Sequence, residues 1–473
     1  MRAGSGAPRE PDARPDARPD GRPDGRRWGS PADLVILLAG AAIAVAAIAP
    51  IVTRWLGNPP DQRLVDLEVY LDGGRAVLRG APLYDVLTQP PQLLPFTYPP
   101  FAAVLAAPLT LLSWRAAQWA WMAAMYAALL IIVAYSFRDL IRRTGRYAPI
   151  AAGALAGGAA WLVPAYDQAR FGQVGLFLMA LCLADCCTRS ARWPRGMLVG
   201  LAIAIKLVPG VFLIYFLLTG RREAAVNAML TAAAAWLGAF ALLPHDSADY
   251  WFGALLEGGD RTGAVNGTTN QAINGIVARL TTEGPLRSGI WLVLALAMAY
   301  YGFRLARRTT LAADRLAGGD RFVGTGRVGG TDHLAAADRL AGPDAYSLLL
   351  AGVAITGLLS VLLSPVGWIH HLVWMIAVIG ALVGDGRDTR RCLVAAGVWA
   401  YFLFPLPWLG TRLLGPDHSL IAVFFGRVVQ DLFGAAAIAM VAVLGRWLVG
   451  RLAERAVRED PSRRAAGVGT LAP

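Results

Sequence analysis

The chain has 473 residues, of which 56% are hydrophobic and only 16% are charged, whereas soluble domains carry roughly 25% charged residues. Apolar stretches that approach the ~20 residues needed to cross a bilayer recur between residues 34 and 448. These features exclude a soluble globular protein and predict an all-α, polytopic integral membrane protein. The net charge of +12 comes from arginines at the ends of apolar stretches, where they orient membrane helices, so it does not indicate a nucleic-acid partner.

Polar composition marks three segments outside the membrane. Residues 1–27 repeat the unit Pro-Asp-Xaa-Arg, and they are expected to form a disordered cytoplasmic tail because they cannot bury a core. An insertion at 304–345 is rich in Gly and Arg and is predicted to be a flexible cytoplasmic loop. Residues 451–473 form a predicted cytoplasmic C-terminal tail. The remaining part, 28–450, is the predicted transmembrane domain, and its first span is expected to be an uncleaved anchor.

Ten apolar segments are predicted to cross the membrane, and two more are ambiguous. The ten are 33–53, 116–137, 148–164, 172–187, 223–243, 286–305, 345–363, 367–384, 391–409 and 425–447. Segments 99–113 and 196–218 either cross or turn back, so the expected number of crossings is about ten to twelve. Length favours twelve crossings.

The positive-inside rule favours ten, because the arginine-rich loops 138–146 and 188–195 then lie in the cytoplasm. Both arrangements place the loops 54–98 and 244–285 on the non-cytoplasmic side.

One basic residue stands apart from all the others. Lys206 is the only lysine of the chain, and it lies with Pro209 in the middle of the apolar segment 196–218. An ammonium group at membrane depth needs an anionic partner or water, and its own segment carries no acid. A lipid phosphate and a protein carboxylate are both possible partners.

The first outer loop, 54–98, is rich in acids and returns to the membrane through the sequence FTYPP, which contains Tyr98. The region is expected to form short interfacial helices, on which Asp66 and Tyr70 fall one turn apart on the same face. Each acid alone is compatible with a solvated loop. Together they indicate the wall of an active site.

Two polar clusters follow later in the chain. The sequence NGTTNQAING supplies Asn270 and Gln271, whose amides suit sugar hydroxyls but are also typical of turns. The sequence SPVGWIHHLVW places Trp368, His370 and His371 near the outer end of a predicted span. A membrane histidine is a candidate for a functional group, although an aromatic belt with a helix-capping histidine is the structural alternative. Adjacent histidines on a helix point about 100° apart, so a metal pair is not expected.

These motifs together resemble glycosyltransferase family 87, the polyprenol-phosphate-mannose-dependent mannosyltransferases of the GT-C superfamily. The motifs that carry the resemblance extend from about Asp66 to Trp374. They are VDLEVYLDGGRAVLRGAPLY, PFTYPPFAAVLAAPL, FGQVGLFLMAL, AIKLVPGVFL, NGTTNQAINGI and SPVGWIHHLVW. Each motif is loose alone, but six in the family's order are fairly specific.

The resemblance implies an inverting transfer of mannose without a metal or other cofactor. Asp66 in VDLEVY matches the family's general base, which would deprotonate an acceptor hydroxyl while polyprenyl phosphate leaves. A histidine of SPVGWIHH would contact the donor, with His370 slightly favoured over His371. From the placement of charge, Lys206 and an outer arginine such as Arg75 or Arg170 are expected to neutralise the phosphate. Gln173 of FGQVG, like Tyr70 and Tyr98, is a further candidate for donor or acceptor binding.

The implied partners are a polyprenyl-phosphate-sugar donor, a mannosylated glycolipid acceptor and the lipid bilayer. The resemblance places the protein in the cell membrane with its active site on the non-cytoplasmic side, and an α-1,2 linkage is the favoured product. Relatives in the family also transfer arabinofuranose, so that sugar is the first alternative. A flippase for the same lipid and a non-catalytic scaffold are alternatives of other classes, but no internal repeat typical of transporters is present.

Overall fold

The computed structural model describes residues 30–59, 62–255, 263–317 and 342–459. In this part of the chain the regular structure is helical, apart from two isolated β-bridges that join Leu87 to Pro95 and Asn270 to Trp368. The predicted all-α, polytopic membrane class is therefore confirmed. The predicted tail at 1–27 and most of the predicted insertion at 304–345 lie outside the described residues.

Six helical segments of the described residues are long and apolar enough to cross a membrane, or seven if one bent pair is a single span. The six are α1 (Pro31–Gly57), α4 (Trp114–Ser136), α11 (Arg222–Leu242), α14 (Pro285–Leu316), α16 (Pro343–Leu362) and the continuous run of α21 (Leu432–Ala442), a π-helix (Val443–Leu448) and α22 (Val449–Glu459). The bent pair is α6 (Ala148–Ala160) and α7 (Val163–Phe171), whose axes differ by 74°.

Fewer long helices are present than the ten to twelve predicted spans because several apolar segments are broken into short helices. The shorter helices, both within these segments and in the loops between them, are α2 (Val65–Arg79), α3 (Pro100–Ala106), α5 (Arg138–Arg143), α8 (Gly175–Cys187), α9 (Met197–Ile205), α10 (Val211–Leu218), α12 (Pro244–Asp249), α13 (Ile273–Leu280), α17 (Met375–Val383), α18 (Thr389–Leu403), α19 (Leu406–Thr411) and α20 (Leu420–Gln430). Short 3-10 helices cover Ala107–Leu111, Gly145–Tyr147, Val208–Gly210 and Ile369–Trp374, and a π-helix covers Tyr250–Ala254.

The ends of two predicted segments differ in the structure. Residues 304–316 belong to α14 and not to a flexible loop, because Ala306, Thr309 and Ala313 form a stripe of small buried residues at helical spacing. Because these small residues are only weakly hydrophobic, the composition of the segment does not indicate a buried helix. The stripe nevertheless packs closely on α16. Likewise α22 continues the last helical run to Glu459, beyond the predicted start of the C-terminal tail at 451.

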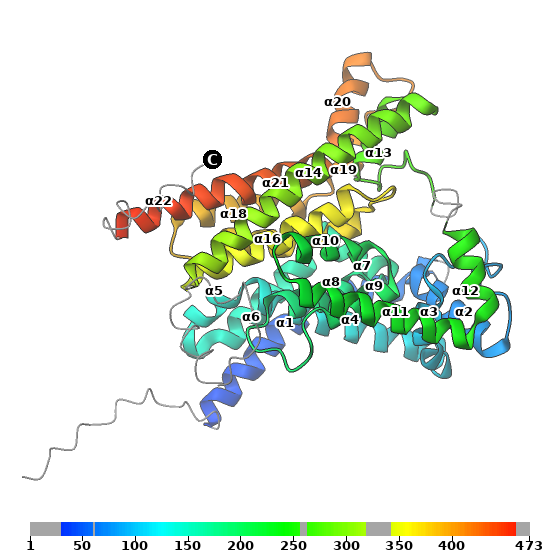
Figure 1. Ribbon diagram of the computed structural model, residues 1–473, viewed down its shortest axis with the longest axis horizontal. Helices are drawn as coiled ribbons and strands as arrows, with labels where there is room; N and C mark the ends of the chain where they lie inside the picture. Colours follow the sequence, from blue (N-terminus) through cyan, green and yellow to red (C-terminus); the bar gives the residue numbers. More distant parts are fainter. Residues whose placement is uncertain (1–29, 60–61, 256–262, 318–341, 460–473) are drawn as a thin grey trace, which may run out of the picture.

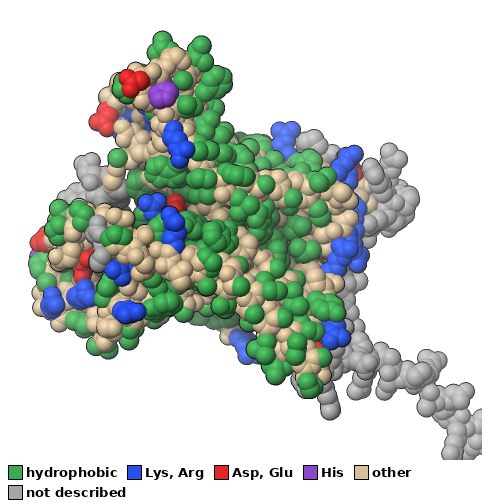
Figure 2. Space-filling model, turned by 180° about the vertical axis from the view of Figure 1, so that it is seen from behind, with side chains coloured by type: hydrophobic (Ala, Val, Ile, Leu, Met, Phe, Trp, Pro, Cys, Tyr) green, Lys and Arg blue, Asp and Glu red, His purple; other side chains and the backbone are tan. Residues whose placement is uncertain are grey.

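The helices pack around α16, which is buried almost throughout, whereas α11 and α14 expose most of their apolar side chains. In Figure 1, α14, α16, α21 and α22 form one side of the bundle, and α1, α4 and α6 lie on the other. The surface in Figure 2 is largely apolar across the middle of the molecule, with basic side chains towards its ends. This distribution is the one expected for a protein with lipid around its middle.

The arginine-rich loops gather at one end of the bundle. A hydrogen bond of 2.6 Å between the hydroxyls of Tyr135 and Thr188 joins the segments that lead into loops 138–146 and 188–195. Arg143 of the first loop donates to the Asp385 carbonyl at 3.2 Å. The structure therefore brings together the loops that the positive-inside rule assigns to one side.

The opposite end is built from the predicted outer loop around α2 (Figure 1). Helix α2 begins after Leu64 and ends at Gly80, whose positive φ of 64° lets its N–H bond back to the last turn. The helix buries Leu67, Tyr70 and Leu71, and it packs on α3. Asp66 and Tyr70 lie one turn apart, as predicted.

Candidate active site

A chain of hydrogen bonds joins Asp66 to three other side chains predicted for the site. The Asp66 Oδ2 accepts from Gln173 Nε2 at 2.6 Å, and Gln173 Oε1 accepts from the Tyr70 hydroxyl at 3.3 Å. The Tyr70 and Tyr98 hydroxyls lie 3.1 Å apart. Asp66 itself is half-buried, whereas Tyr70, Tyr98 and Gln173 are buried. The structure thus brings together residues from α2, from the FTYPP segment and from the turn between α7 and α8.

Gly172 determines how Gln173 reaches Asp66. It ends α7 with a positive φ of 69°, a conformation that favours glycine. A Cβ atom at this position would lie 3.0 Å from Leu64 Cβ and 3.2 Å from Leu67 Cβ. The first turn of α2 therefore packs directly on Gly172, and this contact holds Asp66 next to the following residue, Gln173.

Lys206 lies at a break in the apolar segment and not inside a continuous span. It ends α9 in an extended conformation, with φ −150° and ψ 132°, and the 3-10 turn that contains Pro209 follows directly. Its Nζ lies 3.3 Å from His371 Nε2 and 5.1 Å from the ring centroid of Tyr98. The lone lysine therefore shares the neighbourhood of Tyr98 with Asp66.

The charge state of Asp66 reflects this environment. Burial raises the pKa of Asp66 to about 6, while the Gln173 hydrogen bond and the Lys206 charge act in the opposite direction. A carboxyl group with a pKa near 6 is ionised at neutral pH yet basic enough to accept a proton in a transition state. The group is thus suited to general-base catalysis.

The two histidines have different surroundings. His371 Nδ1 accepts from the backbone N–H of Trp368 at 3.2 Å, and Nε2 faces Lys206. His370 is buried against Phe171, with ring centroids 5.6 Å apart, and its carbonyl accepts from Gln168 Nε2 at 2.8 Å. His371 is thus the imidazole in contact with Lys206, and which of the two histidines contacts the donor stays a prediction. Gln168, which positions this segment, was not identified from the sequence.

Asn270 and Gln271 are fully buried, and their side-chain amides form hydrogen bonds with backbone groups. Asn270 Oδ1 accepts from the N–H groups of Gly367 and Ala272, and its Nδ2 donates to the Val265 carbonyl. Gln271 bonds through both ends of its amide to segment 430–434. These amides are not free to bind a sugar. They hold the loop that carries Trp368 and His371, because the backbone of Gln271 also bonds to Gly367.

Two other predicted residues lie outside the cluster around Asp66. Arg75 pairs with Asp72 on its own helix at 2.6 Å and is partly exposed. Trp368 is partly buried, and it contributes its backbone N–H to His371. Neither side chain has a hydrogen bond to Asp66, Lys206 or His371 among the described contacts.

A cavity of about 40 Å³ adjoins Lys206 and His371. Most of its lining is apolar and comes from four parts of the bundle, represented by Leu178, Phe212 and Trp374 together with Val361. An ammonium and an imidazole therefore stand beside an apolar recess. This combination suits a ligand with an anionic head and a hydrocarbon tail.

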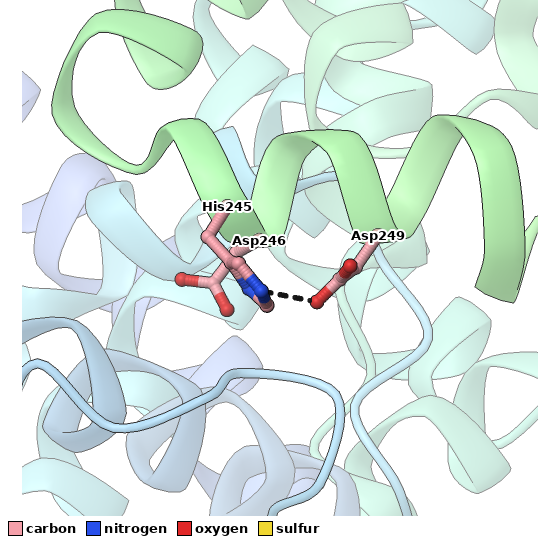
Figure 3. A group of neighbouring side chains, drawn as sticks. All are labelled: His245, Asp246 and Asp249. Atoms are coloured by element: carbon pink, nitrogen blue, oxygen red, sulfur yellow. Dashed lines mark ion pairs between the residues drawn. The ribbon is translucent and has the colours of Figure 1, made fainter.

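One group in the described part of the chain could supply three ligand atoms to a metal ion. His245, Asp246 and Asp249 lie on α12, as Figure 3 shows. His245 pairs with Asp249 at 3.0 Å, and Asp246 accepts from the Leu83 N–H at 2.8 Å. The group therefore ties α12 to the segment after α2, and His245 and Asp249 are largely exposed.

The structure thus combines a polytopic helical fold with a carboxyl group, a lone ammonium group and an imidazole at one end of the bundle. The sequence profile of glycosyltransferase family 87 matches residues 96–325. Two curated relatives are named polyprenol-phosphate-mannose-dependent alpha-(1-2)-phosphatidylinositol mannoside mannosyltransferases. The one from Mycolicibacterium smegmatis is 36% identical, with 83% of this chain and 85% of the relative aligned. The one from Mycobacterium tuberculosis is 32% identical, with 89% of this chain and 91% of the relative aligned.

A further relative from Mycolicibacterium smegmatis, named as the corresponding pentamannoside mannosyltransferase, is 32% identical, with 79% of this chain and 82% of the relative aligned. No solved structure matches the chain significantly. The chain belongs to glycosyltransferase family 87, and the predicted family is confirmed.

Proposed function

We propose that this protein transfers mannose from polyprenyl-phosphate-mannose to a phosphatidylinositol mannoside on the non-cytoplasmic side of the cell membrane. The product is an α-1,2-mannoside, and the anomeric carbon is inverted. The names of the relatives support the donor, the acceptor class and the linkage. The observation that carries the mechanism is the hydrogen-bonded chain from Asp66 through Gln173 and Tyr70 to Tyr98, whose ring centroid lies 5.1 Å from Lys206 Nζ.

Asp66 acts as the general base in a single displacement. The acceptor hydroxyl oxygen forms a bond to the anomeric carbon, its proton passes to the Asp66 carboxylate, and the bond between that carbon and the phosphate oxygen breaks. Polyprenyl phosphate leaves with the bonding electrons. It is a stable anion and needs no proton, so one carboxyl group suffices for inversion. The hydrogen bond from Gln173 orients Asp66 for this step.

Lys206 and His371 bind the phosphate of the donor. His371 Nδ1 accepts a hydrogen bond from a backbone N–H, so the ring proton belongs on Nε2, which faces Lys206 Nζ at 3.3 Å. An Nε2–H and an ammonium that face each other are two donors, and an anionic oxygen is the acceptor that satisfies both. Charge that develops on the leaving phosphate is stabilised by this pair. The side chains that line the recess beside them are mostly apolar, which suits contact with the hydrocarbon next to the phosphate.

The test is a transfer assay with purified protein, radiolabelled polyprenyl-phosphate-mannose and a phosphatidylinositol mannoside acceptor. Asp66→Asn keeps the size and a hydrogen-bond acceptor but removes the base, so we expect the rate to fall by about 10²–10⁴-fold. Asp72→Asn is the matched control, because Asp72 lies on the same helix but pairs with Arg75.

The control variant should keep near wild-type transfer. Transfer by Asp66→Asn at the wild-type rate would overturn the base assignment. A wild-type protein that makes no mannolipid would overturn the proposed function and favour a flippase or a scaffold.

A further inference from the structure

A second charged cavity lies away from Asp66, at the end of the bundle that carries the arginine-rich loops. Its volume is about 470 Å³, and it is lined by Arg387, Asp388, Thr389, Arg390, Arg451 and Arg455. The first four residues precede and begin α18, and the last two come from α22. In Figure 1, α22 and α2 lie at opposite ends of the molecule. The cavity is therefore not part of the candidate active site.

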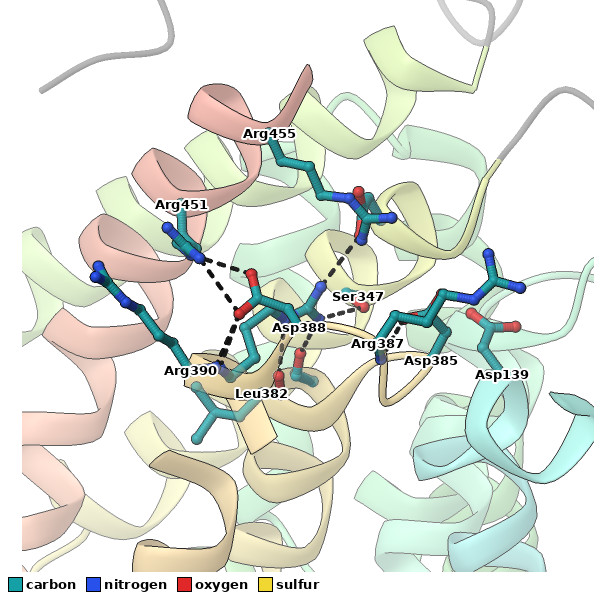
Figure 4. A network of polar contacts seen from close by, with 12 residues as sticks. Asp139, Ser347, Leu382, Asp385, Arg387, Asp388, Arg390, Arg451 and Arg455 are labelled. Carbon is teal, nitrogen blue, oxygen red and sulfur yellow. Dashed lines mark hydrogen bonds and ion pairs between the residues drawn. The ribbon is translucent and has the colours of Figure 1, made fainter. Parts of the chain in front are cut away.

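The wall of this cavity is positively charged, and hydrogen bonds join its two helices. Asp388 accepts from the backbone N–H groups of Arg390 and Arg391 and from Arg451 Nε at 3.0 Å, which fixes α22 against the start of α18. Arg391 is fully buried behind the wall and bonds to Asp344 and Ser347. Figure 4 shows this network, with Arg390 and Arg451 extending from two different helices.

The acids nearby do not neutralise the cavity. Its lining holds four arginines and one aspartate, a net charge of +3. Adding the buried Arg391 and the acids Asp344, Asp385 and Glu454 that pair with these arginines leaves five positive and four negative groups, a net charge of +1. Arg390 is exposed, and no ion pair of its side chain occurs among the described contacts.

Apolar side chains continue from the cavity along the lipid-facing surface. Leu393 follows Arg390 by three residues on α18, so the two side chains lie on neighbouring positions of one helix face, and Leu393 is 67% exposed. Trp447, partly buried, precedes Arg451 by four residues on the last helical run. Guanidinium groups above apolar side chains match a ligand whose phosphate is joined to hydrocarbon.

We propose that this cavity binds the phosphate headgroup of an anionic phospholipid in the leaflet opposite the active site. The guanidinium groups of Arg387 and Arg390 donate hydrogen bonds to the phosphate oxygens, and Arg451 and Arg455 add charge from α22. The acyl chains lie along Leu393. Basic pockets between membrane helices are a recurring site for such headgroups. A free phosphate ion offers the same oxygens without the chains.

The experiment measures binding of phosphatidylglycerol and of phosphatidylcholine to the full-length protein in detergent by native mass spectrometry. The wild type should retain phosphatidylglycerol in preference to phosphatidylcholine. The double variant Arg387→Gln/Arg390→Gln should weaken phosphatidylglycerol binding by about 30-fold. The matched control is Arg142→Gln/Arg146→Gln, which removes the same charge from exposed positions at the same end of the bundle but outside the cavity. This control should bind like the wild type.

Equal weakening by both double variants would overturn the proposal, because it would mean that only the overall charge of this end matters. Binding of inorganic phosphate that depends on Arg387 and Arg390, without a preference for phosphatidylglycerol, would overturn the lipid assignment. Mannosyl transfer should be the same in all these proteins, since none of the altered residues lies near Asp66. A failure here is therefore distinct from a failure of the proposed enzymatic function.

Discussion

The chemistry of Asp66 depends on the side chains around it more than on the residue type. The acidic loop 54–98 contains several carboxyl groups, and Asp66 is the one that accepts a hydrogen bond from Gln173 and lies within the electrostatic reach of Lys206. Burial without these two groups would favour the protonated acid, which cannot act as a base. Burial therefore raises the pKa of Asp66, and Gln173 and Lys206 limit this rise.

The transfer rate should fall as the pH drops through about 6, because the Asp66 carboxylate is then protonated. Gln173→Met removes a hydrogen bond that stabilises the carboxylate, so the pKa of Asp66 should rise further, by about one unit. The acidic limb of the pH–rate profile should therefore move to higher pH. Gln89→Met, at an exposed position of the same loop, is the control and should leave the limb in place. A Gln173→Met profile that coincides with the wild type would show that another group controls this limb.

The two adjacent histidines should differ in their contribution to donor binding. His371→Asn removes the imidazole that faces Lys206, so the KM for polyprenyl-phosphate-mannose should increase and kcat should fall, with an expected total loss of about 10²-fold in kcat/KM. His370→Asn alters a buried ring that packs on Phe171, so it should mainly lower the thermal stability. Steady-state kinetics and thermal unfolding of both variants separate the two effects. A larger loss of kcat/KM in His370→Asn would reverse the assignment.

At the scale of helices, the break in the segment 196–218 explains how Lys206 reaches the candidate active site. By length it is a single membrane span, yet α9 ends at Ile205 and α10 begins at Val211. The break exposes backbone groups that a continuous helix would satisfy, and such breaks occur in membrane proteins where they line a site. Lys206 lies at this break. The lone lysine is therefore placed in the site by the interruption of its helix.

The contact between α1 and α6 is a second feature at this scale. A Cβ atom on Gly153 would overlap the carbonyl oxygen of Gly40, and a Cβ on Gly40 would overlap the backbone at Pro149. Small residues allow this close approach of two membrane helices. We expect Gly153→Leu to force them apart and to destabilise the protein by about 1–3 kcal/mol.

Thermal unfolding in detergent measures this effect as a lower melting temperature. Gly397→Leu is the matched control, because Gly397 also lies within a helix and has no neighbouring atom within 4 Å of its Cβ position. It should be neutral or slightly stabilising, since glycine is a poor helix former. Equal melting temperatures of the two variants would mean that the close contact of α1 and α6 contributes little to stability.

At the scale of the whole molecule, the arginine-rich loops and the candidate active site lie at opposite ends of the helical bundle. The positive-inside rule then assigns the arginine-rich end to the cytoplasm. Loops 138–146 and 188–195 should therefore be cytoplasmic, and the segment after α2 should face the other side.

Cysteine labelling of intact cells tests this orientation. In a background without Cys182, Cys186, Cys187 and Cys392, Arg142→Cys and Arg192→Cys should react with a membrane-impermeant maleimide only after permeabilisation. Asp85→Cys, at an exposed position of the predicted outer loop, should react without it. Reaction of all three in intact cells, or the reverse pattern, would contradict the proposed orientation of the active site.

The membrane class, the family and most of the residues around Asp66 follow from the sequence alone. Three features of this kind are the length of the apolar segments, the i to i+4 spacing of Asp66 and Tyr70, and the isolated position of Lys206. They are local properties, so they can be recognised directly in the amino-acid sequence. The roles of Asn270 and Gln271 are not local. Their partners at Gly367 and Gly434 lie 97 and 163 residues further along the chain.

Only the tertiary structure distinguishes an amide that binds sugar from one that binds the backbone, because both need the same donors and acceptors. The same holds for His370 and His371, which are adjacent in sequence but contact Phe171 and Lys206, respectively. It also holds for the arginines of the second cavity, since positive charge at a helix end is common in any membrane protein. The sequence therefore determined which chemical groups are available. Packing between segments far apart in the chain decided which of them meet, because those contacts depend on how the helices break and cross.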